Sequence, residues 1–285
     1  MRTEIKLGTV CNNNCVFCLN EKHGVTNDSE TIMQRIIHAK EKGVDRIQFT
    51  GGEPTISKDF FKFVGLANNL GLGISVQTNG RTCSYEKFAL RTMLSGASGF
   101  LVSLHAHNEE LNRKITQVPG GFEQTKKGIK NIIKHSGRVT INCVVNSLNV
   151  THLPEIAAHH AKLGADLVQL SWCRPQGKVK VKVGDLIPAY TNHVSFLEQA
   201  LDILKKEGVR AHFYGVPLCL INHRYVPFFG DPYASTVVLS QEMQDARKWI
   251  ANERECYVDK CQGCQYKDKE CTGFFKKYVE HYGPI

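Results

Sequence analysis

Short apolar runs rich in β-branched residues alternate, over residues 1–175, with longer segments in which apolar residues recur at helical spacing. This alternation predicts six strands separated by helices, which is the pattern of a parallel sheet with helices packed outside it. The predicted strands are Ile5–Val10, Arg46–Thr50, Gly73–Thr78, Gly99–Leu104, Val139–Val145 and Asp166–Ser171. The predicted helices lie near Ser29–Lys42, Lys58–Leu70, Tyr85–Leu94, Phe122–His135 and Asn149–Leu163. Six such units favour an α/β fold with an open, partial (β/α)6 barrel of the TIM type over a closed eight-fold barrel.

The remainder of the chain departs from this alternation. A polar stretch with Gly177, Gly184 and the lysines of 178–182 precedes a helix near Asn192–Gly208 and a short strand over Arg210–Tyr214. A loop-rich tail then ends in closely spaced cysteines and has too little apolar patterning to form its own core, so we expect a metal to stabilise it. The chain therefore divides into a core over 1–175, a connecting helix and strand over 176–215, and a small C-terminal cysteine-rich cluster-binding extension over 216–285.

The composition of the 285 residues, with 42% hydrophobic and 22% charged residues, is that of an ordinary globular protein. No apolar run approaches the length of a membrane span, and the first ten residues lack the apolar core of a signal peptide. We therefore expect a cytoplasmic protein with no membrane partner. The net charge of +9 is dispersed and accompanied by no arginine–aromatic stripe, which argues against a nucleic-acid partner.

The 11 cysteines are unevenly distributed along the chain. Three follow the first predicted strand in a single loop: Cys11, Cys15 and Cys18. Four lie close together near the end of the chain: Cys256, Cys261, Cys264 and Cys271. In a reducing compartment, such clustered cysteines are metal ligands or catalytic thiols more often than disulfides. Of the scattered cysteines, three are expected to be packing residues: Cys83, Cys143 and Cys173.

The first cysteine loop has the spacing needed to bind one iron–sulfur cube. A fully ligated [4Fe–4S] cluster needs four cysteines, so three thiolates leave one iron open. An open coordination site at a metal is a place where a substrate or cofactor binds. The spacing by itself leaves one alternative, a zinc site that takes its fourth ligand from elsewhere, such as His23.

The first cysteine loop, with the aromatic Phe17 before its third cysteine, resembles the signature of the radical S-adenosylmethionine (SAM) superfamily. The segment Gly51-Gly52-Glu53-Pro54 after the second strand resembles the family's motif for the SAM amino group. In that motif the glycines let backbone carbonyls approach the cofactor, and Glu53 or those carbonyls neutralise the ammonium. The resemblance implies further SAM contacts near the ends of the later strands, from Thr78, Asn79, Ser103, His105, Asn142 and Gln169.

This resemblance covers roughly residues 1–175 and implies a radical SAM enzyme. The implied reaction is the one-electron reductive cleavage of SAM, which gives methionine and a 5′-deoxyadenosyl radical that takes a hydrogen atom from a substrate C–H bond. An electron donor such as flavodoxin or ferredoxin is implied as a partner. The motifs lie at the carboxyl ends of the predicted strands, where parallel sheets bind ligands. Of the other histidines, His159 and His160 are expected to face solvent.

The second cysteine group resembles the SPASM/Twitch extensions of radical SAM enzymes, which hold an auxiliary [4Fe–4S] cluster. A zinc ribbon is the alternative. Cys219 also lies in this region, so five cysteines compete for four places. We predict that the four clustered cysteines ligate and that Cys219 is a catalytic residue, because an S–H bond is weak enough to return a hydrogen atom to a carbon radical. Equally open is the reverse, in which Cys219 ligates and Cys256 is spare.

The predicted substrate is a ribosomally made peptide, modified by epimerisation or crosslinking, because family members with auxiliary clusters commonly modify peptides. Only ten residues precede Cys11, so we expect the barrel or a separate protein to recognise that peptide. One alternative is a small-molecule epimerase or dehydrogenase acting on an amino sugar or aminocyclitol, and a tRNA-modifying enzyme is less favoured. The GTP-cyclising enzymes of molybdopterin synthesis also carry two clusters, but their longer chains end in Gly-Gly, whereas this one ends in Gly283-Pro284-Ile285.

Overall fold

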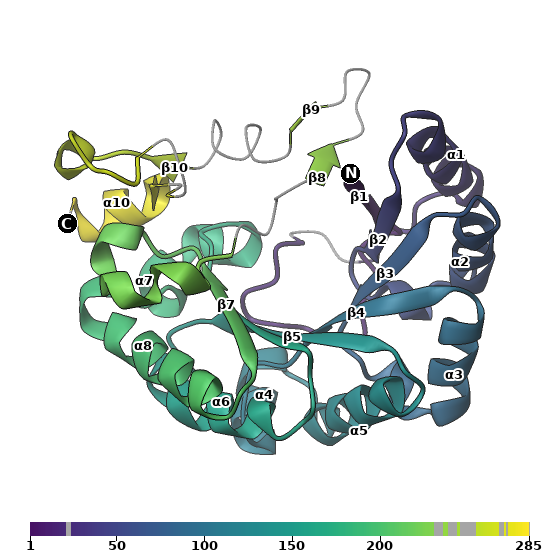
Figure 1. Ribbon diagram of the computed structural model, residues 1–285, viewed down its shortest axis with the longest axis horizontal. Coiled ribbons are helices and arrows are strands. Elements are labelled where there is room, and N and C mark those ends of the chain that lie inside the picture. The colour runs from purple at the N-terminus through teal and green to yellow at the C-terminus, as the bar shows by residue number, and fades with distance from the viewer. Residues whose placement is uncertain are drawn as a thin grey trace.

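Seven parallel strands that alternate with helices form the central sheet of the protein (Figure 1). The computed structural model describes residues 1–20, 24–230, 236–238, 244–245, 255–267, 271 and 273–284. The seven strands are β1 (Arg2–Lys6), β2 (Arg46–Thr50), β3 (Gly73–Thr78), β4 (Ala97–Ser103), β5 (Arg138–Val145), β6 (Leu167–Trp172) and β7 (Arg210–Tyr214). They lie side by side in chain order, with β1 and β7 at opposite ends of the series.

Helices cover the convex side of this sheet (Figure 1). They are α1 (Ser29–Glu41), α2 (Phe60–Asn69), α3 (Glu86–Leu94), α4 (Glu109–Thr116), α5 (Gly121–Lys134), α6 (Leu153–Ala161) and α8 (Tyr190–Lys206). Helices α7 (Val183–Leu186) and α10 (Lys276–Tyr282) contact each other beside the C-terminal extension (Figure 1). Four further strands are short: β8 (Thr236–Val238) pairs with β1, β9 (Gln244–Asp245) pairs with β8, and β10 (Glu255–Cys256) pairs with β11 (Phe274–Phe275). Short 3-10 helices lie in several of the connections. No described helix combines the length and apolar character needed to cross a lipid bilayer.

The predicted partial barrel is confirmed, with one parallel strand more than the six expected. The segment Arg210–Tyr214, assigned from the sequence to the connecting part, pairs with β6 and extends the sheet. Strands β1 and β7 form no ladder with each other in the described part of the chain. The sheet is therefore an open arc rather than a closed barrel, with β7 at one edge and the short strands β8 and β9 beyond β1 at the other (Figure 1).

The first strand lies earlier in the sequence than predicted. It spans Arg2–Lys6, whereas the apolar pattern suggested Ile5–Val10. Beyond Lys6 the backbone leaves the ladder and turns toward the loop after β2, where the carbonyls of Gly8 and Val10 accept hydrogen bonds. The prediction failed because the N–H groups that bond to these carbonyls belong to Gly52 and Glu53, which are remote in the sequence.

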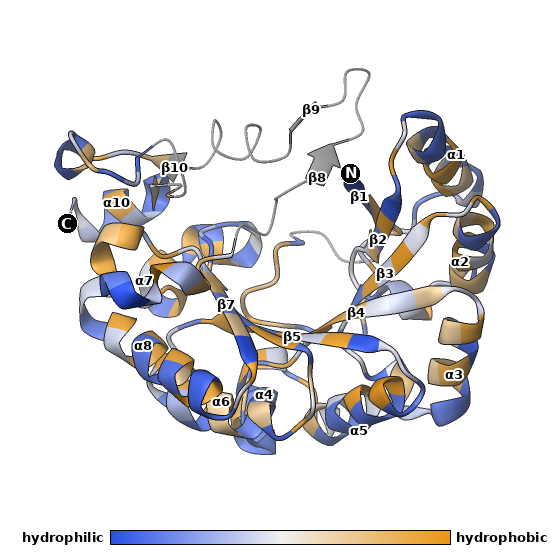
Figure 2. Ribbon diagram, in the orientation of Figure 1, coloured by the Kyte–Doolittle hydropathy of each residue, from blue (hydrophilic) through white to orange (hydrophobic). Residues whose placement is uncertain are grey.

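The strands alternate between an apolar convex face and a polar concave face. On β2, Ile47 and Phe49 are fully buried against the helices, while Gln48 and Thr50 belong to the opposite face. The other strands follow the same alternation. Figure 2 shows helices that combine hydrophobic and hydrophilic stretches, as expected for elements with one face on a sheet and the other toward water. The inside of the arc is therefore lined by polar side chains, unlike the packed interior of a closed barrel.

The C-terminal helix packs into the same core as the end of the barrel. Trp172, Tyr190 and Tyr278 belong to one buried cluster, with the rings of Tyr190 and Tyr278 at a centroid distance of 4.2 Å. The hydroxyl of Tyr278 accepts a hydrogen bond of 2.8 Å from the backbone N–H of Tyr190. Cys261 and Cys271 are buried in this cluster too. The barrel therefore fixes the position of the cysteine-rich extension.

Asn131 generates a prediction about stability. Its buried side-chain amide donates hydrogen bonds of 2.9 Å and 3.1 Å to the carbonyls of Cys83 and Ser84, which ties α5 to the turn after β3. We expect Asn131→Leu to lower the free energy of unfolding by about 1–3 kcal/mol, because buried carbonyls lose their donor. Denaturant unfolding measures this change. The exposed Asn69→Leu is the control and should shift stability by no more than about 0.5 kcal/mol; equal losses in both variants would contradict the explanation.

Candidate active site

The loop that carries Cys11, Cys15 and Cys18 crosses the carboxyl end of the sheet and rests on the segment after β2. The N–H groups of Gly52 and Glu53 donate hydrogen bonds of 2.9 Å and 2.8 Å to the carbonyls of Gly8 and Val10. A Cβ atom at residue 52 would lie only 2.1 Å from the carbonyl oxygen of Val10. Glycine is thus required here for a close approach between two backbones of the protein itself, a constraint that the sequence interpretation did not identify.

The carboxylate of Glu53 is the buried centre of the site. Its side chain is 3% exposed, and one oxygen accepts hydrogen bonds from the backbone and hydroxyl of Thr55 and from the hydroxyl of Thr78, at 3.2, 2.6 and 2.6 Å. The other oxygen accepts a bond of 2.6 Å from the N–H of Asn79. Burial raises the pKa of this carboxyl, and the four donors act in the opposite direction. Glu53 therefore holds the turns after β2 and β3 together.

Asn79 and Arg81 extend this network to the first cysteine loop. The side-chain amide of Asn79 donates a bond of 2.6 Å to the side chain of Asn12. Arg81 donates to the backbone carbonyl of Asn12, to the side chain of Asn13 at 3.0 Å, and to Gln124 on α5 at 2.7 Å. The loop between Cys11 and Cys15 is therefore gripped by the turn after β3. The sequence interpretation identified Thr78 and Asn79 but missed Arg81, which lies two residues beyond Asn79.

The three thiols of this loop are suited to a cluster. All three are free and partly exposed, and the N–H of Asn13 donates to the sulfur of Cys11 at 3.3 Å. Burial, together with the neighbouring thiolates of Cys11 and Cys18, raises the pKa of Cys15 to about 12. The thiol must then lose its proton when iron binds, because the thiolate is the form that ligates iron. In the described part of the chain, no three ligand side chains converge on the position of a single ion. A cube does not need this, because each cysteine binds a different iron.

Phe17 and His105 join the loop to the barrel. The Phe17 ring is 9% exposed and lies edge-on to the His105 ring at a centroid distance of 4.9 Å. The Nδ1 atom of His105 accepts a hydrogen bond of 3.1 Å from the N–H of Val144. Burial lowers the pKa of His105 to about 3, so the ring is neutral near pH 7. An accepting Nδ1 in a neutral ring leaves the proton on Nε2. His105 therefore offers one fixed hydrogen-bond donor.

Polar side chains from neighbouring strands pair on the concave face. Asn142 on β5 accepts hydrogen bonds of 3.0 Å from Gln169 and 2.5 Å from Ser171, both on β6. Across the arc, Gln77 on β3 accepts from Gln48 on β2 at 3.0 Å. Ser103 ends β4 on the same face, according to the alternation of that strand. The predicted contacts of the later strands are thus brought to one surface beneath the cysteine loop.

The second cysteine group contains Cys219 but leaves Cys256 at its edge. Burial raises the pKa of the Cys219 thiol, and the charges of Cys271, Cys261 and Cys264 raise it further. The backbone N–H groups of Leu218 and Gly273 approach the sulfur of Cys271, the second at 3.4 Å. Burial raises the pKa of Cys256, and among the thiols of the described residues it is the charge of Cys261 that raises it further. This arrangement favours the alternative in which Cys219 belongs to the ligand set.

Two other histidine expectations have clear outcomes. His160 is fully buried rather than solvent-exposed, and its Nε2 lies 3.0 Å from the carbonyl oxygen of Leu104 at the end of β4. The expectation failed because the apolar face of α6 includes this position and the acceptor lies on a distant strand. His159 is partly buried and packs against Phe122. His23, the alternative fourth ligand of a zinc site, lies outside the described residues. Cys83, Cys143 and Cys173 are buried, as expected of packing residues.

Comparison with known proteins gives consistent results. The model of the Radical SAM superfamily matches residues 5–160. A "Probable GTP 3',8-cyclase" from Methanococcus aeolicus is 30% identical over 62% of this chain and 60% of its own length. The protein of that name from Saccharolobus islandicus is 30% identical over 79% of this chain and 73% of its own. Streptococcus suis SuiB bound to precursor peptide SuiA has a similar fold, with a TM-score of 0.63 and 17% identity over 75% of this chain and 48% of SuiB. The chain thus spans less than two thirds of the first relative and about half of SuiB.

The hydrogen bonds from Arg81 to the first cysteine loop lead to a second prediction. We expect Arg81→Met to destabilise the cluster-bound loop by about 1.5–3 kcal/mol, the usual contribution of hydrogen bonds to a charged group. Chelator-driven iron loss from the reconstituted protein should then accelerate by roughly tenfold to a hundredfold. Arg91→Met removes an arginine that stacks on Phe61 away from the site and serves as the matched control. An iron-loss rate in Arg81→Met equal to that of the wild type would show that the loop does not depend on this side chain.

Proposed function

Because the chain belongs to the radical SAM superfamily, we propose that Cys11, Cys15 and Cys18 hold its [4Fe–4S] cluster and leave one iron open for SAM. The protein is a radical SAM enzyme, and the bound cluster and SAM supply a 5′-deoxyadenosyl radical that removes a hydrogen atom from a substrate C–H bond. The observation that carries the assignment is the hydrogen-bonded junction of three motifs through Glu53, Asn79 and Asn12.

The protein's own groups bind and orient SAM in this proposal. The carbonyls after β2, rather than the Glu53 carboxylate, face the SAM ammonium, because both oxygens of that carboxylate accept hydrogen bonds from protein donors. The carbonyl of Gly51 accepts a hydrogen bond of 3.3 Å from Asn20 in the loop, which shows that this carbonyl faces the loop. The Nε2–H of His105 donates to SAM, while Ser103, Asn142 and Gln169 line the surface below. Phe17 anchors the loop and keeps water from the cluster side.

For the second cysteine group we propose an auxiliary [4Fe–4S] cluster. Its ligands are the four cysteines that lie together: Cys219, Cys261, Cys264 and Cys271. The N–H groups directed at the sulfur of Cys271 favour its thiolate, as hydrogen bonds to a charged group do. Cys256 is then the spare thiol. The prediction made from the sequence assigned the opposite roles to Cys219 and Cys256.

We propose a peptide substrate, held in extended form along the concave face and entering at the open side of the arc. The open arc and its polar lining support this assignment, because an extended chain needs a long groove with many hydrogen-bonding groups. The similar fold of SuiB, whose structure contains a precursor peptide, also supports it. A charged group also lies near the ends of β6 and β7: the Arg174 guanidinium is 5.2 Å from the ring centroid of Tyr214, and its charge lowers the pKa of Glu4 against the larger effect of burial.

A second candidate substrate is a nucleotide such as GTP. The specific observation in its favour is the 30% identity with a GTP 3',8-cyclase relative over 79% of this chain. Arg174 would suit a phosphate group, because a planar guanidinium binds phosphate oxygens in pairs. The two candidates differ in what should stimulate turnover, so one assay separates them.

The central prediction concerns release of 5′-deoxyadenosine. Anaerobically reconstituted protein with dithionite and SAM should release it, and Cys15→Ala should abolish the release because the cluster loses a ligand. Cys143→Ala removes a buried thiol outside the loop and should retain it. Chromatography of the quenched reaction measures the product. Stimulation by GTP would support the nucleotide candidate, and stimulation by a candidate peptide the first. Absence of product from the wild type would refute the proposed function.

Iron content tests the second ligand set. The reconstituted wild type should contain about eight irons, the content of two cubes, and Cys219→Ala should retain about four. Cys256→Ala is the matched control and should retain the wild-type content, because its thiol lies at the edge of the group. The reverse pattern would restore the ligand set predicted from the sequence. Full iron in Cys219→Ala, with SAM cleavage but no substrate product, would identify Cys219 as a hydrogen-atom donor instead, and one zinc with about four irons would indicate a zinc site.

A further inference from the structure

The lysine-rich segment η4 (Gly177–Val181) packs directly on the first cysteine loop. The N–H of Lys178 donates a hydrogen bond of 3.0 Å to the carbonyl of Cys18, and its ammonium donates one of 2.6 Å to the side chain of Asn14. A Cβ at residue 177 would lie 2.4 Å from that same carbonyl of Cys18. The backbone of this segment is therefore in contact with Cys18, a proposed cluster ligand, although the two are far apart in the sequence.

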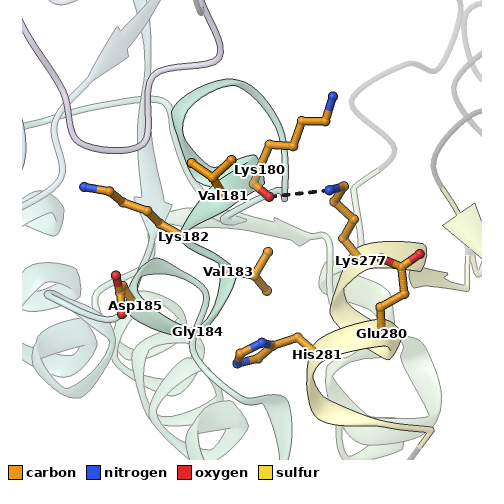
Figure 3. A pocket seen from close by; sticks show the side chains of 9 residues that line it. All are labelled: Lys180, Val181, Lys182, Val183, Gly184, Asp185, Lys277, Glu280 and His281. Carbon is orange, nitrogen blue, oxygen red and sulfur yellow. Dashed lines mark hydrogen bonds between the residues drawn. The ribbon is translucent and has the colours of Figure 1, made fainter.

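The other side of this segment meets helix α10, and a pocket of about 410 Å³ lies between them. Figure 3 shows the pocket between the loop that carries Lys180 to Asp185 and the helix that carries Lys277, Glu280 and His281. The ammonium of Lys277 lies 3.5 Å from the carbonyl oxygen of Lys180, which links the two walls. The surface thus spans from the first cysteine loop to the cysteine-rich extension.

This surface is basic, with exposed apolar residues at its ends. Its lysines are Lys178, Lys180, Lys182, Lys276 and Lys277, and they outnumber the carboxylates of Asp185 and Glu280. None of these lysines forms an ion pair with a carboxylate in the part of the chain that the structure describes. Val181 is 84% exposed, and Leu19, which lies against Gly177, is 56% exposed. Exposed apolar side chains next to a group of like charges are typical of a protein-binding surface.

We propose that this surface, formed by residues 177–185 and α10, docks an acidic one-electron carrier protein of the flavodoxin or ferredoxin type. The inference rests on the proposed function, since the cluster must receive one electron for each SAM cleaved. On docking, the carrier is oxidised by one electron and the cluster held by Cys11, Cys15 and Cys18 is reduced by one. The contact between Lys178 and Cys18 brings the docked carrier close to that cluster. Unpaired lysines attract an acidic partner and speed a transient encounter, which suits repeated electron delivery.

Charge reversal at Lys180 and Lys182, the rim of this surface, tests the proposal. In the double variant Lys180→Glu, Lys182→Glu, the initial rate of 5′-deoxyadenosine release should fall by tenfold or more when photochemically reduced flavodoxin is the donor at low ionic strength. The rate with dithionite should stay at the wild-type value, because this small anion needs no docking surface. Raising the ionic strength should slow the flavodoxin-driven rate of the wild type and narrow its difference from the variant, because salt screens the attraction.

The matched control is Lys127→Glu, Lys130→Glu on α5, which makes the same change of charge on exposed positions of another helix. This variant should keep its flavodoxin-driven rate. Equal flavodoxin-driven rates in the rim variant and the wild type, or equal losses in the rim and control variants, would overturn the proposal. A rim variant that loses substrate-dependent turnover with dithionite as well would assign the surface to substrate binding and overturn it too. Failure of the wild type to release 5′-deoxyadenosine with dithionite would instead refute the proposed function.

Discussion

A buried carboxylate is the constraint on which the site depends. Removing the charge of Glu53 from water is costly, and it is tolerated because four hydrogen-bond donors surround it. Those donors come from the turns after β2 and β3, so satisfying the charge fixes both turns. Asn79 passes the constraint to Asn12 in the cysteine loop, which has no secondary structure of its own. The order of the cluster loop is thus coupled to a charge inside the sheet edge rather than to a local fold.

The open sheet leaves a polar concave face on which a substrate can bind. Its convex face follows the usual rule of apolar packing on helices, while its concave face pairs polar groups from neighbouring strands, as between Asn142 and Gln169. Those pairs satisfy one another without a ligand and keep the surface polar and ordered. A substrate can exchange these hydrogen bonds for its own at modest net cost, because hydrogen bonds are traded rather than created.

The periodicity of the sequence was sufficient for the strands and most helices, since a strand such as β3 or β5 is specified by its own alternation. It failed where the deciding partner is remote. The end of β1 is set by hydrogen bonds to Gly52 and Glu53, and the burial of His160 by a carbonyl on another strand. The sequence identified the residues of the motifs but not which of them bond to other parts of the protein. Glu53 and Asn79 bond to the protein, and Arg81, outside the motif, holds the loop.

The relation between the two cysteine groups follows from packing rather than from their spacing in the sequence. Tyr278 anchors α10 against Tyr190, so the extension shares the core of the barrel and has no independent position. The segment Gly177–Val181 bridges the remaining gap, with Lys178 bonded to the first loop and the carbonyl of Lys180 facing Lys277 on α10. The first cysteine loop and helix α10 of the extension therefore border one basic surface, and the charge of that surface bears on both.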